Sequence, residues 1–149
     1  MDNGIISSFS VLVFVFICHY GKETKKSIGS LLHQRFTKEQ FGSFLDFKSL
    51  NLGENIPKKI REVILKCTTA IILFSPGFCS SKYCLNEVLM ILEEKKPFIP
   101  IFWDIDPSEL EAALEDNKGH FPESDMENYR AAIKEVIDIG GIVFQSNKQ

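Results

Sequence analysis

The sequence lacks the glycine-rich motifs that usually hold phosphate groups. It contains neither a G-x-G-x-x-G pattern after its first apolar segment nor a G-x-x-x-x-G-K-[ST] pattern, so the usual dinucleotide and P-loop cradles are missing. It also lacks an excess of positive charge, because 17 basic and 20 acidic residues give a formal net charge of -3. Nucleic acid is therefore not an expected partner. No internal repeat or linker divides the 149 residues, which suit one domain.

Cysteine is scarce and shows no metal-binding pattern. Cys18 and Cys67 lie in or beside apolar segments, where a free thiol behaves as a small hydrophobe. Cys79 and Cys84 are close in sequence, but no second pair with metal-ligand spacing accompanies them. We therefore expect no metal site and a reducing, cytoplasmic compartment with access to the nucleus.

A long apolar run is missing as well. The segment from Phe9 to Ile17 is too short to cross a bilayer, no basic residue precedes it, and no small-residue cleavage site follows it. Its β-branched and aromatic residues favour a strand buried on both faces of a parallel sheet. We interpret this segment as part of the fold and expect no membrane partner.

Apolar strands alternate with amphipathic helices along the chain. In the first helix we expect Thr24 as the N-cap and a buried face made of Ile28, Leu31, Leu32 and Phe36. The expected strands are residues 9–17, 42–46, 69–74, 98–103 and 142–144.

Proline and glycine mark several of the expected boundaries. Pro57 suits the first turn of a second helix. Pro100 lies inside the fourth strand and cannot donate to a ladder, which predicts an edge position or a bulge there. The stretch from Glu109 to Pro122 is expected to be irregular, before a last helix that starts at Glu127.

This alternation predicts an α/β fold of the flavodoxin-like type. Strands that alternate with helices form right-handed βαβ units and a parallel sheet. We expect a three-layer sandwich, in which a five-stranded parallel sheet has helices on both faces.

The polar residues that could carry chemistry follow the predicted strands. The loops containing Tyr20, residues 48–55, residues 80–87 and residues 104–108 should gather at the carboxyl edge of the sheet, where open α/β folds bind ligands. Tyr83 and Glu87 are four residues apart on one helix, so their side chains project from one face.

One carboxylate beside an aromatic ring and a helix N-terminus would suit a ribose-phosphate ligand. When the leaving base of a nucleoside is cationic, it departs neutral without a proton, and the carboxylate need only stabilise an oxocarbenium-like ribosyl centre. The alternative is that Glu87 is a solvated helix residue, since the apolar stripe of its helix uses other positions. Cys84 lacks a matched histidine, which favours a buried structural cysteine over a nucleophile.

Four motifs carry a family resemblance. Residues 74–87 read FSPGFCSSKYCLNE, residues 99–108 read IPIFWDIDPS, residues 44–47 read FLDF and residues 52–56 read LGENI. On these motifs the chain resembles, from end to end, the plant TIR (Toll/interleukin-1 receptor) domains. The resemblance implies a single TIR domain over residues 1–149, with a folded core at about 9–144 and short tails. The stop after Phe144 resembles the short TIR-only type.

The resemblance also implies an activity. Many plant TIR domains hydrolyse NAD+, releasing nicotinamide and making ADP-ribose or cyclic and variant ADP-ribose signals in innate immunity. NAD+ is then the substrate, and no cofactor is expected. Activity in the family generally needs self-association through TIR–TIR contacts. By this resemblance Glu87 is the catalytic residue, and the substrate-binding residues are His19, Tyr20, Gly21, Leu52, Gly53, Ser81 and Tyr83.

Three positions depart from the family pattern. Tyr20 stands where an arginine is usual and cannot supply a guanidinium for a phosphate. Tyr83 replaces a tryptophan and still offers an aromatic face. Ser30 and Leu31 stand where a serine-histidine pair used in self-association is common. These departures keep two alternatives open: a non-catalytic TIR–TIR interaction module, and a nucleotide sensor that binds without cleaving.

Overall fold

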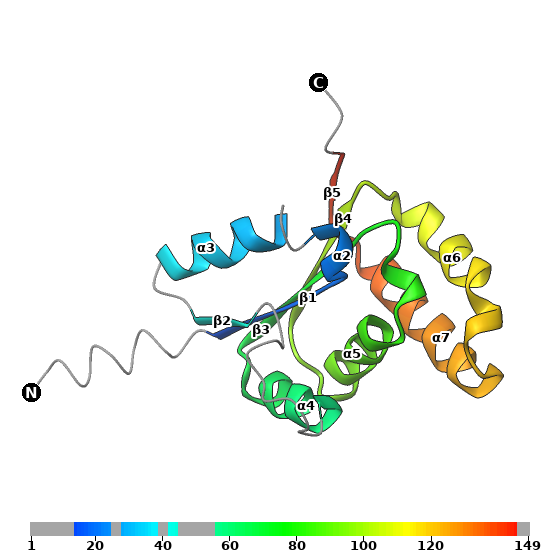
Figure 1. Cartoon of the computed structure of the whole chain (residues 1–149), viewed down its shortest axis with the longest axis horizontal. Helices are drawn as coiled ribbons and strands as arrows, with labels where there is room; N and C mark the ends of the chain where they lie inside the picture. Colours follow the sequence, from blue (N-terminus) through cyan, green and yellow to red (C-terminus); the bar gives the residue numbers. More distant parts are fainter. Residues whose placement is uncertain (1–13, 25–27, 39–41, 45–55, 146–149) are drawn as a thin grey trace, which may run out of the picture.

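The architecture is a parallel sheet between two unequal helical layers. The computed structural model describes residues 14–24, 28–38, 42–44 and 56–145. Five parallel strands form one sheet in the order β2-β1-β3-β4-β5. The predicted fold class is confirmed (Figure 1).

Three strands have the bounds that the sequence predicts. β3 (Thr69–Phe74), β4 (Phe98–Trp103) and β5 (Ile142–Phe144) have the predicted bounds. β2 is described over Gly42–Phe44, and residues 45 and 46 of the predicted strand lie outside the described residues. β1 is described over Phe14–His19, so it ends two residues after the predicted end at Ile17; residues 9–13 of the predicted strand lie outside the described part of the chain.

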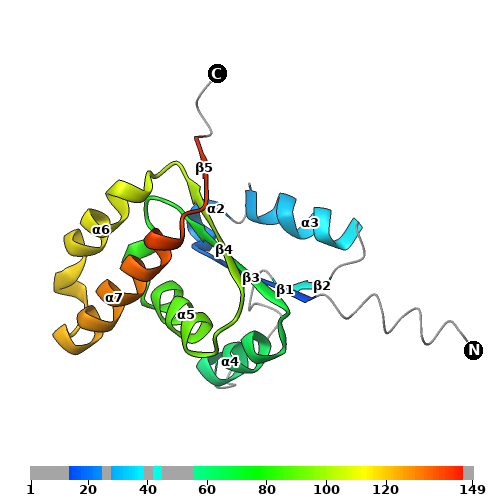
Figure 2. The same ribbon diagram turned by 180° about the vertical axis from the view of Figure 1, so that it is seen from behind.

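The two faces of the sheet are covered differently. α4 (Ile56–Lys66), α5 (Lys82–Glu93), α6 (Pro107–Asp116) and α7 (Glu123–Ile139) lie on one side, and α3 (Ser30–Lys38) lies on the other (Figures 1 and 2). Even-numbered residues of β1, β3 and β4 contribute to the large core under α4–α7. A smaller core of Val15, Ile17 and Ile71 lies under Leu32 and Phe36 of α3.

The stretch predicted to be irregular is helical. α6 begins directly after Asp106, whose side chain accepts from the Ser108 N–H at 3.0 Å, while the Glu109 carboxylate accepts from the Asp106 N–H at 2.9 Å. This reciprocal pair is a capping box, and Pro107 at the first helical position supports it. The signal was therefore present in the sequence. α7 also starts at Glu123, four residues before the predicted Glu127.

The first helix is oriented differently from the prediction. Leu32 and Phe36 pack on the sheet, but Leu31 is 62% exposed. Thr24 does not cap this helix, which begins at Ser30. It belongs to the short helix α2 (Gly21–Thr24), where its hydroxyl donates to the Tyr20 carbonyl at 3.0 Å.

Pro100 is accommodated inside the sheet without an edge position. It is aligned with Ile72 of β3, and pairing with β5 begins one residue later, at Ile101 and Ile142. Gly141 lies beside it, and a Cβ on Gly141 would clash with the Pro100 carbonyl oxygen. The last strand can therefore reach β4 only with a glycine at this position.

We predict that Gly141→Ala destabilises the domain by about 1–3 kcal/mol, because the new Cβ must push β5 away from the backbone of Pro100. The free energy of unfolding from urea titration measures this. Gly119→Ala is the matched control, since nothing lies within 4 Å of a Cβ there. Equal stabilities of the two variants would contradict the close approach.

Candidate functional site

The predicted catalytic carboxylate lies on α5, directly after the carboxyl end of β3. A short 3-10 helix, η3 (Phe78–Ser80), links the strand to α5. Ser81 then caps α5: its hydroxyl oxygen accepts from the Cys84 N–H at 3.3 Å. This N-cap fixes where the helix starts and therefore which direction each side chain of its first two turns points.

Glu87 is buried, with 8% of its surface exposed. The sequence placed it off the apolar stripe and left open that it is a solvated residue; the structure contradicts that alternative. α5 contacts α4, α7 and β1 together, so its buried surface is wider than one stripe. Burial raises the pKa of the Glu87 carboxyl to about 8, whereas a hydrogen bond with the Cys18 thiol works in the opposite direction.

Cys18 forms the other wall of the site, and sequence reasoning did not assign it a role there. It is the fifth residue of β1 and fully buried, and its thiol also lies 3.7 Å from the Cys84 carbonyl oxygen. Burial, followed by the negative charge of Glu87, raises the pKa of the Cys18 thiol. No local pattern signals this contact, because the two residues are far apart in the chain and meet only when α5 packs on β1.

The other cysteines near the site are not activated nucleophiles. Burial raises the pKa of Cys79 and Cys84 to about 12. The Cys84 thiol lies 3.4 Å from the His19 carbonyl oxygen, which ties α5 to the end of β1. All four cysteines are buried and free. Within the described residues, no group of three His, Cys, Asp or Glu side chains is placed to hold a metal ion.

The end of β1 and α2 bring His19, Tyr20 and Gly21 to the same edge of the sheet. The Nδ1 atom of His19 lies 2.8 Å from the Thr24 hydroxyl oxygen. Since that hydroxyl donates its proton to the Tyr20 carbonyl, its oxygen accepts from Nδ1–H, which favours the Nδ1-protonated tautomer.

Tyr20 packs against the turn that follows β3. A Cβ on Gly77 would lie 2.8 Å from a ring carbon of Tyr20 and 3.0 Å from a carboxylate oxygen of Glu23. The Gly77 N–H donates to Glu23 at 2.7 Å. Glu23, which the sequence did not single out, thus joins the loop after β1 to the loop after β3. The absence of a side chain at Gly77 allows this approach.

The remaining predicted residues are divided between the helix and the loop after the second strand. Tyr83 lies in the first turn of α5 and is 53% exposed, so its ring is available at the surface one turn before Glu87. Leu52 and Gly53 lie outside the described residues, as does most of the loop from Lys48 to Ile56.

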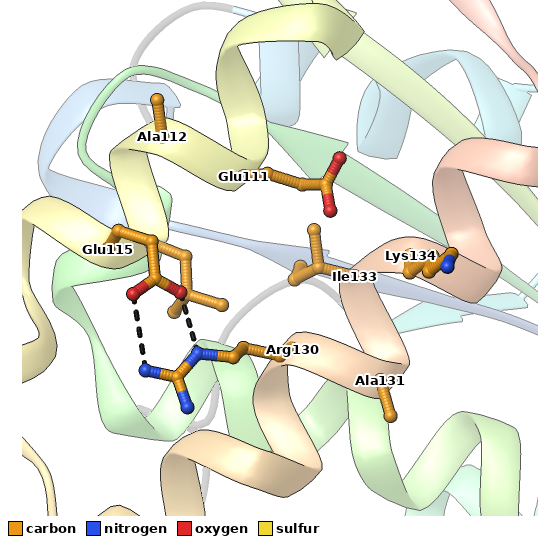
Figure 3. A pocket seen from close by; sticks show the side chains of 8 residues that line it. Glu111, Ala112, Glu115, Arg130, Ala131, Ile133 and Lys134 are labelled. Atoms are coloured by element: carbon orange, nitrogen blue, oxygen red, sulfur yellow. Dashed lines mark hydrogen bonds and ion pairs between the residues drawn. The ribbon is translucent and has the colours of Figure 1, made fainter.

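A separate cavity of about 350 Å³ lies between α6 and α7 and is lined by none of the predicted site residues (Figure 3). Arg130 spans it, donating to Glu115 at 2.7 and 3.1 Å and to Glu123 at 2.8 Å. The guanidinium of Arg130 already pairs with the carboxylates of Glu115 and Glu123. We therefore interpret the cavity as a gap between two packed helices and not as a ligand site.

The geometry at Glu87 suits the stabilisation of a positive charge. A carboxylate in a water-poor environment interacts more strongly with a developing cation than it would in water. Its raised pKa makes its charge responsive to what binds, since a cation nearby favours the ionised form. The first turn of α5 adds the exposed aromatic ring of Tyr83, one helical turn before this carboxylate.

Comparison with known proteins identifies the family of this chain. The family model described as the TIR domain matches residues 13–149. A probable 2' cyclic ADP-D-ribose synthase, BdTIR of Brachypodium distachyon, is 38% identical over 134 residues, covering 89% of this chain and 59% of its own length. The TMV resistance protein N of Nicotiana glutinosa is 31% identical over 85% of this chain but only 12% of its own length. The chain thus spans less than two thirds of these relatives.

A solved structure gives the same result for the fold. The TIR domains of the activated Roq1 resistosome, which directly recognises the pathogen effector XopQ, superpose with a TM-score of 0.79 at 26% identity. The match covers 91% of this chain and 89% of the other. With the family model matched over residues 13–149, this chain belongs to the TIR domain family.

Proposed function

We propose that this chain is an NAD+ hydrolase of the plant TIR type, which cleaves the bond between nicotinamide and ribose and produces ADP-ribose or cyclic or variant ADP-ribose signals in innate immunity. The observation that carries this proposal is the buried carboxylate of Glu87, with its raised pKa, at the carboxyl edge of a parallel sheet. The relative named for synthesis of 2' cyclic ADP-D-ribose supports the substrate class.

NAD+ matches the chemistry of a single carboxylate. Its nicotinamide is cationic and leaves as a neutral molecule, so the reaction needs no general acid for the leaving group. Positive charge moves onto the ribose as the bond breaks, and the ionised Glu87 stabilises it while accepting hydrogen bonds from ribose hydroxyls. The same cation shifts Glu87 toward its ionised form when the substrate binds.

The other predicted residues take supporting roles in this proposal. Tyr83 provides an aromatic wall beside the ribose and nicotinamide. Ser81 positions α5 through its N-cap. His19, Tyr20 and Gly21 are the proposed contacts from the end of β1 and from α2, and Leu52 and Gly53, which lie outside the described residues, are proposed as further substrate contacts. NAD+ is the substrate, so the proposed reaction includes no separate cofactor.

The proposal includes self-association, as in the Roq1 assembly of TIR domains. A cytoplasmic location stays a prediction. In the described part of the chain, no helix combines the length and the apolar character that crossing a membrane requires.

A second candidate is a non-catalytic TIR–TIR module, and one observation favours it. Tyr20 occupies the position of the usual arginine and packs against Gly77, so it brings no positive charge to the phosphates of NAD+. A direct measurement of nicotinamide release decides between the two candidates.

We predict that purified protein at high concentration releases nicotinamide from NAD+ and that Glu87→Gln lowers the rate at least about a hundredfold, because the replacement keeps the shape but loses the charge. Chromatography of nicotinamide measures the rate. Glu93→Gln on the same helix is the matched control, since Glu93 is exposed and forms a surface ion pair with Arg61, at 3.8 Å. Equal rates for wild type and Glu87→Gln would leave the non-catalytic module as the function.

The activity should also depend on pH through Glu87. With a pKa of about 8 in the free protein, the carboxyl is mostly neutral at pH 6 and ionised above pH 8. We expect kcat/KM for NAD+ to rise about tenfold per pH unit below this pKa and to level off above it. A profile that is flat or falls between pH 6 and 8 would show that the ionised form is not the active one.

The burial of Glu87 should make stability depend on pH in a defined direction. Its pKa is higher in the folded than in the unfolded state, so stability is greatest below the unfolded value of about 4.5 and falls as pH rises to about 8.

We predict that Glu87→Gln removes this decline and is the more stable form at pH 8 by on the order of a few kcal/mol. Urea titration at pH 5, 6.5 and 8 measures it. Glu93→Gln should follow the wild-type curve. Parallel curves for wild type and Glu87→Gln would contradict the raised pKa.

A further inference from the structure

Two buried thiols join β1 to α5 next to the candidate catalytic carboxylate. The Cys18 thiol on β1 lies 3.7 Å from the Cys84 carbonyl oxygen on α5, and the Cys84 thiol lies 3.4 Å from the His19 carbonyl oxygen at the end of β1. Cys84 precedes Glu87 by three residues, so the two side chains share one face of α5. These contacts therefore hold the helix face that carries Glu87 against the carboxyl end of β1.

The Cys18 side chain points toward this helix face. Phe16 and Cys18 of β1 belong to the large core under α4–α7, as do Cys84 and Leu85 of α5. Cys18 is completely buried, and Glu87 is 8% exposed. The thiol and the carboxyl group thus meet in a layer from which water is largely excluded, and they are joined by the hydrogen bond described above.

The Cys18 thiol has one proton and two acceptors within reach. One acceptor is the neutral carbonyl of Cys84, at 3.7 Å, and the other is the carboxylate of Glu87. A hydrogen bond to an ionised acceptor is about twice as strong as one to a neutral acceptor. When Glu87 is ionised, the thiol proton therefore favours the carboxylate, and when Glu87 is neutral this preference is lost.

Cys18 remains a donor over the pH range in which Glu87 changes its charge. Its burial, followed by the nearby carboxylate, raises the pKa of the thiol well above its ordinary value. Burial raises the pKa of Glu87 only to about 8. The thiol therefore keeps its proton while Glu87 ionises, and this proton is available to the carboxylate at the pH at which we expect activity.

The other titratable groups on the elements packed against α5 have partners of their own. Those that are at least partly buried are His19 on β1, Cys79 on η3, Lys59 and Arg61 on α4, and Asp125, Tyr129 and Arg130 on α7. The three cations form ion pairs with glutamates, and Tyr129 donates to Asn86 at 2.8 Å. None of these described groups contributes to the pKa of Glu87, which burial raises and the Cys18 thiol lowers.

We propose that Cys18 is a positioning residue for the hydrolysis: its thiol donates to one oxygen of the ionised Glu87 carboxylate and holds the other oxygen toward the ribose. This rests on the proposed function and assigns the orientation of its carboxylate to β1. A carboxylate has about four acceptor sites on two oxygens, so the thiol and the ribose hydroxyls can bind it together. The restraint weakens when Glu87 is neutral, which couples its orientation to its charge.

The pKa of Glu87 measures this hydrogen bond without any need for turnover. Carbon-13 NMR titration of the side-chain carboxyl carbon in the full chain gives this pKa, and Glu87→Gln assigns the signal. Cys18→Ala removes a donor to the charged form, so we expect the pKa of Glu87 to rise by about one. Cys18→Ser supplies a hydroxyl, which is a stronger donor than a thiol, so we expect the pKa to fall below the wild-type value.

Cys79→Ala is the matched control. Its thiol is equally buried and lies 3.9 Å from a backbone carbonyl oxygen, that of Leu110, but it takes no part in the pKa of Glu87. We expect this variant to keep the wild-type pKa of Glu87. Circular dichroism checks that each variant is folded.

Opposite shifts in the alanine and serine variants identify the hydrogen bond, because a purely structural role of Cys18 would not reverse the direction of the shift. An unchanged or lower pKa of Glu87 in Cys18→Ala overturns the proposal. An unchanged or higher pKa in Cys18→Ser also overturns it. If Cys18→Ala does not fold, the serine variant alone decides.

The kinetics of nicotinamide release test the positioning role separately. The midpoint of kcat/KM against pH should move with the pKa of Glu87 in each variant. At pH 10 the carboxylate is ionised in all of them, and Cys18→Ala should still lower kcat about tenfold with little change in KM, because the charge is present but its orientation is not held. A wild-type kcat in Cys18→Ala at this pH overturns the positioning role.

This outcome is separable from that of the proposed function. Nicotinamide release that depends on Glu87, together with an unchanged pKa in both Cys18 variants, leaves the hydrolase standing and overturns the role of Cys18. Absence of release by the wild-type protein overturns the proposed function and the positioning role with it, even where the NMR titration confirms the hydrogen bond.

Discussion

The packing of α5 against β1 is the contact on which the candidate site depends. It pushes the Glu87 carboxylate into an apolar layer beside the Cys18 thiol, and desolvation there raises its pKa to about 8. An exposed glutamate would keep its ordinary pKa and interact weakly with a passing cation. The Ser81 N-cap fixes the start of α5. The hydrogen bond from the Gly77 N–H to Glu23 joins the loop after β3 to the segment after β1.

The same sheet explains why the two faces of the domain differ. One face is buried under α4–α7 and contains most of the core, including Phe16, Phe74 and Phe102. The other face has α3 alone among the described helices, and its β4–β5 half remains apolar and exposed. The candidate site at Glu87 and this exposed apolar surface therefore lie on different sides of the sheet.

Several features could be predicted because they depend on local physics. Thr69–Phe74 is an uninterrupted apolar run, and its bounds as a strand were predicted without error. The capping box at Asp106 and Glu109 was equally local and was overlooked, because the acidic residues that follow it suggested an irregular surface. Leu31 was predicted to be buried but is exposed. The sequence pattern does not show how much of the helix surface the sheet covers.

The sequence by itself determined the alternation of strands and helices, the parallel sheet and the position of Glu87 four residues after Tyr83, because these follow from periodicity and spacing along the chain. Only the tertiary structure decided that Glu87 is buried, that Cys18 is its partner, that Glu23 meets Gly77, and that half of one sheet face stays open. Each of these depends on contacts between residues distant in sequence, and burial is a property of the assembled layers rather than of any one segment.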